Sequence, residues 1–208
     1  ESAYAKSLPD DQPWYNPGGK LPKVFGEGSE NPGPGFYASL PPSPYGDQLT
    51  LDFARAAIAG EGLGMDNVTD ILAVSLSGHD YINHAWGPES RLSHDHLLHL
   101  DRMLEAFFRD LDRIVGVANY LAVLTADHGF MPAPEYSKTL GRDAGRLNVP
   151  QTLAELNAGL VEKFGAGRWV RFWSASGVML DDALIAKDGV DRRALEAEGR
   201  RILLGLPG

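Results

Sequence analysis

An aspartate and a histidine stand where an apolar stretch of the sequence ends. The run YLAVLTADHGF, residues 120–130, places Asp127 and His128 directly after a segment that we predict to be a buried strand. Adjacent residues in an irregular turn can converge on one ion, and Gly129 permits backbone conformations that other residues avoid. Because carboxylate and imidazole groups are both zinc ligands, the pattern predicts a metal site here, with an ordinary polar turn as the alternative.

A second aspartate and histidine follow an earlier apolar run. In DILAVSLSGHDYINHAWGP, residues 70–88, Asp80 and His84 are four residues apart. If this segment is helical, both side chains project from one face and can hold one ion, although solvated helix faces also carry such pairs. Two pairs at the ends of two strands favour two cations about 3.5–4 Å apart, which clamp the attacking and leaving oxygens in phosphoryl displacement.

The other polar side chains near these pairs have structural explanations. Three histidines begin an amphipathic helix, and we interpret them as solvated groups or as supports for the ligands: His94, His96 and His99. His79 is interpreted as a loop residue. The hydroxyl groups of Ser77 and Thr125 lie within or at the end of the predicted strands, where a hydrogen bond is a commoner role than nucleophilic attack. Neither is taken as a nucleophile.

The elements that position the two pairs form a strand–helix–strand unit. Residues 71–76 and 120–125 are short apolar runs typical of strands covered on both faces of a parallel sheet. Between them, apolar residues recur at helical spacing over residues 93–115, with Ser93 as the predicted N-cap. Such a unit has a right-handed crossover, and ligands gather at the carboxyl ends of its strands. We therefore predict an α/β fold with a mostly parallel sheet and helices on both faces, incomplete in this chain.

Further elements flank this unit. Residues 1–44 are rich in proline and glycine and are expected to be irregular, whereas residues 45–208 belong to the α/β core. Helices are predicted from Asp47 to Ala59, with Asp47 as the cap, and over residues 150–164. Two short strands are expected in RWVRFW and GVML, and a last helix is expected after the N-cap Asp191, stapled by Val190 and Leu195.

The bulk composition narrows the class of function. A chain of 208 residues with 43% apolar residues can bury a core. A net charge of −9 argues against nucleic-acid binding, and the absence of cysteine leaves histidine, aspartate and glutamate as the strong metal ligands. No apolar run approaches the ~20 residues of a membrane helix. Because the sequence opens on Glu1 rather than Met and closes on LLGLPG, we interpret it as a piece of a longer polypeptide, so the missing signal peptide says little about its location.

The order and spacing of these motifs resemble the alkaline phosphatase superfamily. The resemblance is to its type I phosphodiesterase/nucleotide pyrophosphatase-like branch, which includes bacterial alkaline phosphatases with a threonine nucleophile. It spans residues 44–164 and rests on the segments SPYGDQLTLDFARAAIAGEGLG, DILAVSLSGHDYINHAWGPES, LDRMLEAFFRDLD, YLAVLTADHGFMPAPEY and DAGRLN. It implies two Zn²⁺ ions, with Mg²⁺ or another divalent ion as an alternative. Asp80 and His84 would be ligands of the first ion, and Asp127 and His128 of the second.

The resemblance also implies groups that this chain does not contain. The nucleophile, a further aspartate and a last histidine ligand lie elsewhere in relatives, so the isolated chain is expected to be inactive. The parent protein is expected to be a periplasmic or extracellular phosphomonoesterase that acts through a covalent phospho-enzyme intermediate. Its partners would be a small phosphate ester and the remainder of the polypeptide. The alternatives are a phosphodiesterase, a nucleotide pyrophosphatase, a sulfatase-like cousin and a non-catalytic metal-binding domain.

Overall fold

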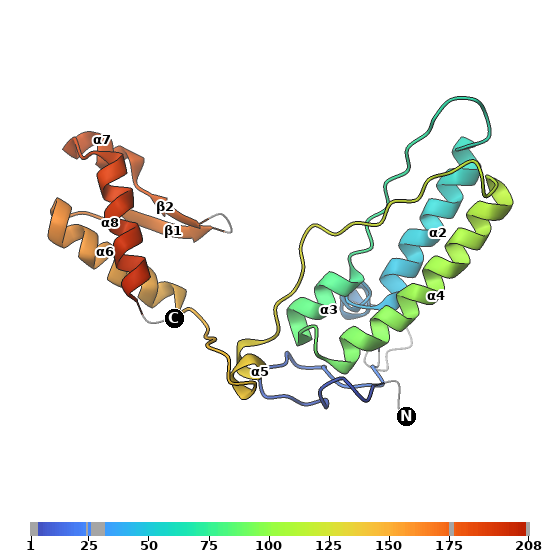
Figure 1. Ribbon diagram of the computed structural model, residues 1–208, viewed down its shortest axis with the longest axis horizontal. Coiled ribbons are helices and arrows are strands. Elements are labelled where there is room, and N and C mark those ends of the chain that lie inside the picture. The colour runs from blue at the N-terminus through green and yellow to red at the C-terminus, as the bar shows by residue number, and fades with distance from the viewer. Residues whose placement is uncertain (1–3, 24, 26–31, 175–176, 207–208) are drawn as a thin grey trace. The chain divides into compact units, whose positions relative to one another are not determined.

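The computed structural model describes the chain except residues 1–3, 24, 26–31, 175–176 and 207–208. The chain divides into two compact units, a first unit of residues 1–133 and a second unit of residues 134–208, and each is described by itself (Figure 1). Within the described residues, every helix is too short or too polar to cross a membrane.

The first unit is built on helices that pack around a small apolar core. Its helices are α1 (Pro34–Ser39), α2 (Pro44–Glu61), α3 (Gly78–Trp86) and α4 (Arg91–Ile114). Helix α2 packs along α4 through four buried residues, which are Leu51, Ala54, Ile58 and Phe107. Helices α2 and α4 therefore lie where the sequence predicted helices. The spacing of Leu49 and Phe53 had marked the wrong face of α2, since these side chains are 58% and 76% exposed.

The two predicted N-caps of these helices are wrong by about one turn. Helix α2 begins after Ser43, and Pro44 takes a first-turn position where a missing N–H costs nothing. Helix α4 begins after Ser90, whose hydroxyl oxygen accepts a hydrogen bond from the N–H of Ser93 at 3.1 Å. Asp47 instead lies inside the first turn of α2 and is buried. Its carboxylate is therefore free to make contacts outside its own helix.

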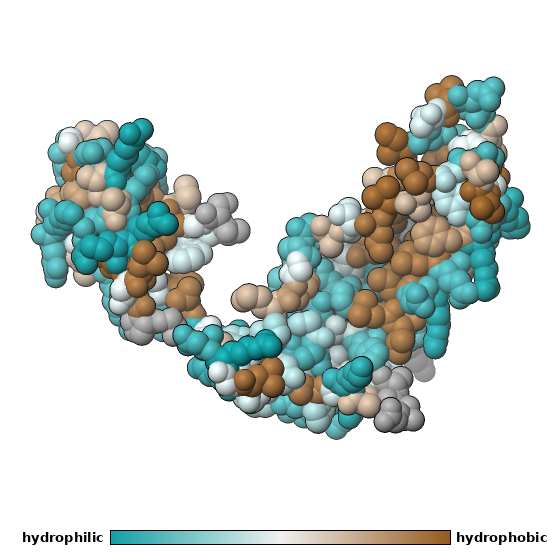
Figure 2. Space-filling model, viewed as in Figure 1, coloured by the Kyte–Doolittle hydropathy of each residue, from teal (hydrophilic) through white to brown (hydrophobic). Residues whose placement is uncertain are grey.

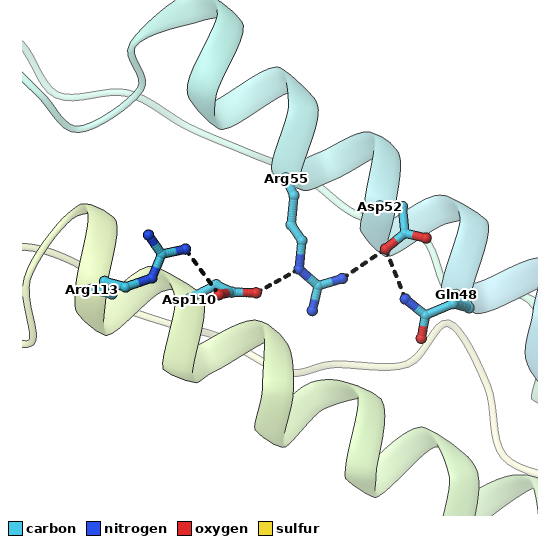
Figure 3. A network of polar contacts seen from close by, with 5 residues as sticks. All are labelled: Gln48, Asp52, Arg55, Asp110 and Arg113. Carbon is cyan, nitrogen blue, oxygen red and sulfur yellow. Dashed lines mark hydrogen bonds and ion pairs between the residues drawn. The ribbon is translucent and has the colours of Figure 1, made fainter.

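A polar network lines the edge where α2 meets α4 (Figure 3). Arg55 donates to Asp110 at 2.8 Å and to Asp52 at 3.0 Å. Asp52 also accepts from Gln48, and Asp110 accepts from Arg113. Hydrogen bonds from Arg55 and then Arg113 lower the pKa of Asp110. Solvent screens pairs this exposed, so the network adds little to the stability of the unit.

The N-terminal segment packs on α3 and α4. The indole N–H of Trp86 donates to the carbonyl oxygen of Asn16 at 2.9 Å, and the N–H of Leu8 donates to the carbonyl of Glu89 at 2.9 Å. The predicted irregular segment falls partly on residues 1–3, 24 and 26–31, which lie outside the described residues. Its described part is mostly turns and bends, with α1 near its end. This segment therefore covers the end of α3.

The two predicted parallel strands are extended but unpaired, which corrects the sequence prediction. The side chains of Ile71, Leu121 and Val123 are 92%, 89% and 80% exposed, and apolar surface gathers on the first unit (Figure 2). A strand obtains its hydrogen bonds and its cover only from neighbours. In the described part of the first unit, no second strand lies beside either segment. The predicted parallel sheet and its crossover are therefore absent here, as expected of an incomplete fold.

The second unit is a helical layer packed on a hairpin. It contains α5 (Pro134–Thr139), α6 (Val149–Phe164), β1 (Val170–Ser174), β2 (Gly177–Leu180), α7 (Asp182–Asp188) and α8 (Arg192–Gly205). Strands β1 and β2 are antiparallel, which confirms the two short strands predicted from the sequence. Its core consists of Leu156, Leu160, Trp169, Val170, Ile185 and Leu195. Asp191 caps α8 as predicted, since its carboxylate accepts from the N–H of Arg193 at 3.1 Å.

Candidate metal centre

Helix α3 presents the first predicted ligand pair on one face. Asp80 lies in the first turn and His84 in the last turn. Their ligand atoms, Oδ1 of Asp80 and Nε2 of His84, are 3.4 Å apart. A carboxylate near the N-terminus of a helix and an imidazole near its C-terminus both suit the helix dipole. The four-residue spacing therefore places both groups side by side, as the helical alternative in the sequence required.

The second predicted pair lies on the extended segment that follows α4. Nε2 of His128 is 3.3 Å from Oδ1 of Asp80 and 3.7 Å from the carboxylate of Asp127. Nδ1 of His128 lies 2.9 Å from the carbonyl oxygen of Gly129. This hydrogen bond, and next the charge of Asp127, raise the pKa of His128. When the proton of the neutral ring is on Nδ1, the ring donates to Gly129 and turns its Nε2 lone pair toward Asp80.

Three of the four predicted residues form one group of potential ligands. One ligand atom from each of Asp80, His84 and His128 lies within 4.8 Å of the others. Oδ1 of Asp80 is buried and has no hydrogen-bond partner, although both imidazoles face it. A buried carboxylate oxygen without a donor is costly unless a cation or a further donor satisfies it. Two nitrogens and one oxygen suit a zinc ion that keeps an open position. The residues present therefore fit a divalent metal.

Asp127 stands apart from this group. Its side chain is 87% exposed, and its carboxylate approaches only His128 among the predicted ligands. The structure thus brings His128 to the α3 pair, whereas the sequence placed it with Asp127 on a separate ion. The division of the four residues between two ions stays a prediction.

Two residues that were not singled out in the sequence border the group. The ring of Phe130 lies edgewise to the rings of His84 and His128, with centroids 4.9 and 5.0 Å away. Glu89, in the turn between α3 and α4, accepts a hydrogen bond from the N–H of Ala133 at 3.2 Å. These contacts hold the segment with His128 against α3. Phe130 could have been found from its place directly after Gly129, whereas nothing local distinguishes Glu89.

The histidines at the start of α4 differ from one another. Nδ1 of His94 lies 3.0 Å from the hydroxyl of Ser7, and His99 is half exposed beside Asp95. His96 is only 1% exposed, which excludes the solvated group among the two alternatives given for it and leaves the support for the ligands. Its Nε2 lies 2.9 Å from Oδ2 of Asp47. Periodicity alone could not find this pair, since the partner is on another helix.

Three further residues, His79, Ser77 and Thr125, differ from their sequence predictions in structure or exposure. His79 belongs to the first turn of α3 rather than to a loop, and burial lowers its pKa. Ser77 and Thr125 are exposed, because the strands that were expected to bury them are unpaired. The hydroxyl of Ser77 lies 3.2 Å from that of Ser75. None of the three is among the clustered ligands.

Comparison with known proteins settles the family. The sequence profile of the type I phosphodiesterase / nucleotide pyrophosphatase family matches residues 19–153. The chain belongs to this family, within the alkaline phosphatase superfamily. The resemblance stated from the motifs is thereby confirmed.

Several curated relatives of this chain are named as alkaline phosphatases, and one, from Myroides odoratus, is named as a calcium-transporting ATPase. PafA of Elizabethkingia meningoseptica is 43% identical over 124 residues, which are 60% of this chain and 22% of that protein. PhoV of Synechococcus elongatus is 48% identical over 100 residues, 48% of this chain and 18% of that protein. PhoK of a Sphingomonas species is 35% identical over 177 residues, 83% of this chain and 31% of that protein. The chain thus spans between about a fifth and a third of these relatives.

A solved structure supports the same assignment. The crystal structure of wild-type alkaline phosphatase PafA matches with a TM-score of 0.81 at 30% identity, over 98% of this chain and 39% of that chain. The chain therefore has the fold of part of an alkaline phosphatase. This explains the unpaired strands of the first unit, since most of the matched structure has no counterpart here.

Proposed function

We propose that this chain is the metal-ligand segment of a phosphate-ester hydrolase, an alkaline phosphatase-like phosphomonoesterase. The observation that carries the proposal is the convergence of Asp80, His84 and His128 around a buried carboxylate oxygen that lacks a donor. Membership of a family of phosphate-ester hydrolases supports it, as do relatives named as alkaline phosphatases. The rest of the polypeptide would supply the substrate pocket.

The proposed metals are two Zn²⁺ ions, with Mg²⁺ or another divalent ion as the alternative. Asp80 and His84 would hold the first ion, while Asp127 and His128 would hold the second. Bound divalent ions lower the pKa of water and screen the charge of a phosphate group. The contribution of this chain is to present the ligands: α3 fixes Asp80 and His84, and the carbonyl of Gly129 orients the ring of His128.

The groups that complete the reaction are proposed to lie outside this chain. A threonine or serine hydroxyl from elsewhere in the polypeptide would form a covalent phospho-enzyme intermediate. Further strands would pair with residues 71–76 and 120–125, which would complete a mostly parallel sheet with helices on both faces. A periplasmic or extracellular location belongs to the same proposal.

The test compares the full-length protein with single variants in zinc-containing buffer. Hydrolysis of p-nitrophenyl phosphate that exceeds hydrolysis of bis-p-nitrophenyl phosphate, and that a chelator removes, is the expected result. His84→Ala and Asp127→Ala should each lower the bound metal, measured by mass spectrometry, because each removes a ligand. His99→Ala is the matched control, since His99 is a half-exposed histidine of α4 outside the ligand group.

The other outcomes assign the alternatives. Faster hydrolysis of the bis-ester would favour a phosphodiesterase or nucleotide pyrophosphatase. Turnover of p-nitrophenyl sulfate alone would favour a sulfatase-like enzyme. Tight metal binding without turnover of any of these esters would favour a non-catalytic metal-binding domain. Metal content that is the same in His84→Ala, Asp127→Ala and the wild type would refute the ligand assignment.

A further inference from the structure

A buried carboxylate from one helix caps the start of another. Asp47, in the first turn of α2, is 2% exposed, and its Oδ1 accepts a hydrogen bond from the N–H of Gly78 at 3.0 Å. Gly78 is the first residue of α3, and Ser77, which precedes it, makes no capping hydrogen bond with its side chain. The first N–H groups of a helix lack partners within it and favour negative charge. Asp47 of α2 therefore accepts the N-terminal hydrogen bond of α3 that the side chain of Ser77 does not accept.

A buried imidazole from a third helix lies beside this carboxylate. His96 of α4 is 1% exposed, and its Nε2 lies 2.9 Å from Oδ2 of Asp47. A buried carboxylate without a nearby donor or cation is strongly unfavourable. The two atoms are close but are not aligned for a hydrogen bond, so the contact fixes the position of the His96 ring beside Asp47 without satisfying Oδ2. The two groups link α2, α3 and α4 at one point.

The fit at this point leaves no room for a larger residue than glycine. A Cβ atom added to Gly78 would lie 2.6 Å from Oδ2 of Asp47 and 2.8 Å from Nε2 of His96. Both distances are well below contact distance, so a side chain would push α3 away from the pair. The ring of His96 also stacks on the ring of His79, with centroids 5.4 Å apart and planes inclined by 28°. The backbone just before Asp80 is therefore held at two adjacent residues.

We propose that the Asp47–His96 pair positions α3 so that Asp80 and His84 meet the metal, and this inference rests on the proposed function. The pair touches none of the clustered ligands, so Asp47 and His96 are positioning residues. A buried pair of polar side chains is weak evidence of a stabilising role, because apolar residues of similar volume often stabilise a protein as well. The proposed effect of the pair is local: it fixes the backbone at Gly78, two residues before the candidate ligand Asp80. Groups bonded directly to a ligand typically change metal affinity by about 10- to 100-fold, and a support that acts through the backbone is expected at the lower end of this range.

The experiment measures zinc affinity of the full-length protein by competition with a chromophoric chelator. Gly78→Ala and His96→Ala should each weaken binding at one ion by about tenfold or more, while near-UV circular dichroism of the metal-free variants stays native. His96→Gln should recover part of the loss, because its amide nitrogen can still reach Asp47. Gly60→Ala is the matched control: Gly60 is inside α2, nothing lies within 4 Å of an added Cβ, and zinc affinity should not change.

The controls separate failure of this inference from failure of the proposed function. If the wild-type protein binds no zinc, the proposed function falls and the inference falls with it. If the wild type binds zinc and the folded variants bind it equally tightly, only the inference is overturned. If His96→Ala does not fold, His96→Asn decides with the same expectation, since its shorter side chain cannot reach Asp47 but can bind water.

Discussion

Replacing Trp86 by phenylalanine should destabilise the first unit by about 2 kcal/mol. Trp86 ends α3 and is 5% exposed, and its indole N–H donates to the carbonyl of Asn16 at 2.9 Å. Losing this hydrogen bond costs about 1 kcal/mol. The carbons of the lost ring account for a similar amount, at about 0.8 kcal/mol per buried methylene. The ammonium of Lys23, 4.2 Å from the ring centroid, still faces an aromatic ring in the variant.

Urea unfolding followed by far-UV circular dichroism measures this cost. The matched control is Trp173→Phe, the same change on β1 of the second unit, where the residue is 37% exposed. The control should change the free energy of unfolding by no more than about 0.5 kcal/mol. Equal shifts for the two variants would refute the reasoning that Trp86 anchors α3. Because His84 lies two residues before Trp86, the variant should also weaken zinc binding by the full-length protein.

Two further predictions concern the second unit. Hydrogen bonds from Arg201 and then Lys163 lower the pKa of Glu198 from 4.5 to about 2. The ionised Glu198 carboxylate stabilises the fold above about pH 4.5, and this stabilisation is lost as the pH falls toward 2. The melting temperatures of Glu198→Gln and the wild type should therefore differ at pH 7 and converge near pH 2. A difference in melting temperature that does not change with pH would contradict this. Gly159→Ala should stabilise by less than the about 1 kcal/mol that alanine gains over glycine inside an open helix, because the new Cβ lies 2.7 Å from Cδ1 of Ile202 and moving that methyl group has a cost. Ile202→Val should relieve that cost in the double variant, and additive urea-unfolding energies would argue against the clash.

The helices were predictable because their determinants are local. Helices α2, α4, α6 and α8 all lie where the sequence predicted helices, with bounds that differ by a few residues. Asp191 was identified correctly as a cap because its partner is two residues away. Asp47 was misread as a cap of its own helix. Its carboxylate bonds a residue on another helix, and local sequence cannot show such a contact.

Whether a predicted strand is paired in the structure depends on how far away in the sequence its partner strand lies. Strands β1 and β2 form a hairpin, so each supplies the hydrogen bonds of the other within a few residues, and the prediction is confirmed. Residues 71–76 and 120–125 have the apolar composition of parallel strands, but a parallel strand needs neighbours that are remote in the sequence. This chain covers 39% of the matched alkaline phosphatase structure. The apolar composition of these two segments predicts strands covered by neighbours, and the described residues of this chain do not include such neighbours.

The candidate metal centre has a local part and a non-local part, and only the local part can be predicted from spacing. Asp80 and His84 are visible as a pair because one helical turn separates them. From the sequence, Asp47 was predicted to be a helix cap, His96 was a solvated group or a support for the ligands, and Gly78 was not singled out. Their role follows only from their meeting at 2.9–3.0 Å. A motif can therefore indicate candidate ligands, whereas the groups proposed to position them are found only in the packing of three helices.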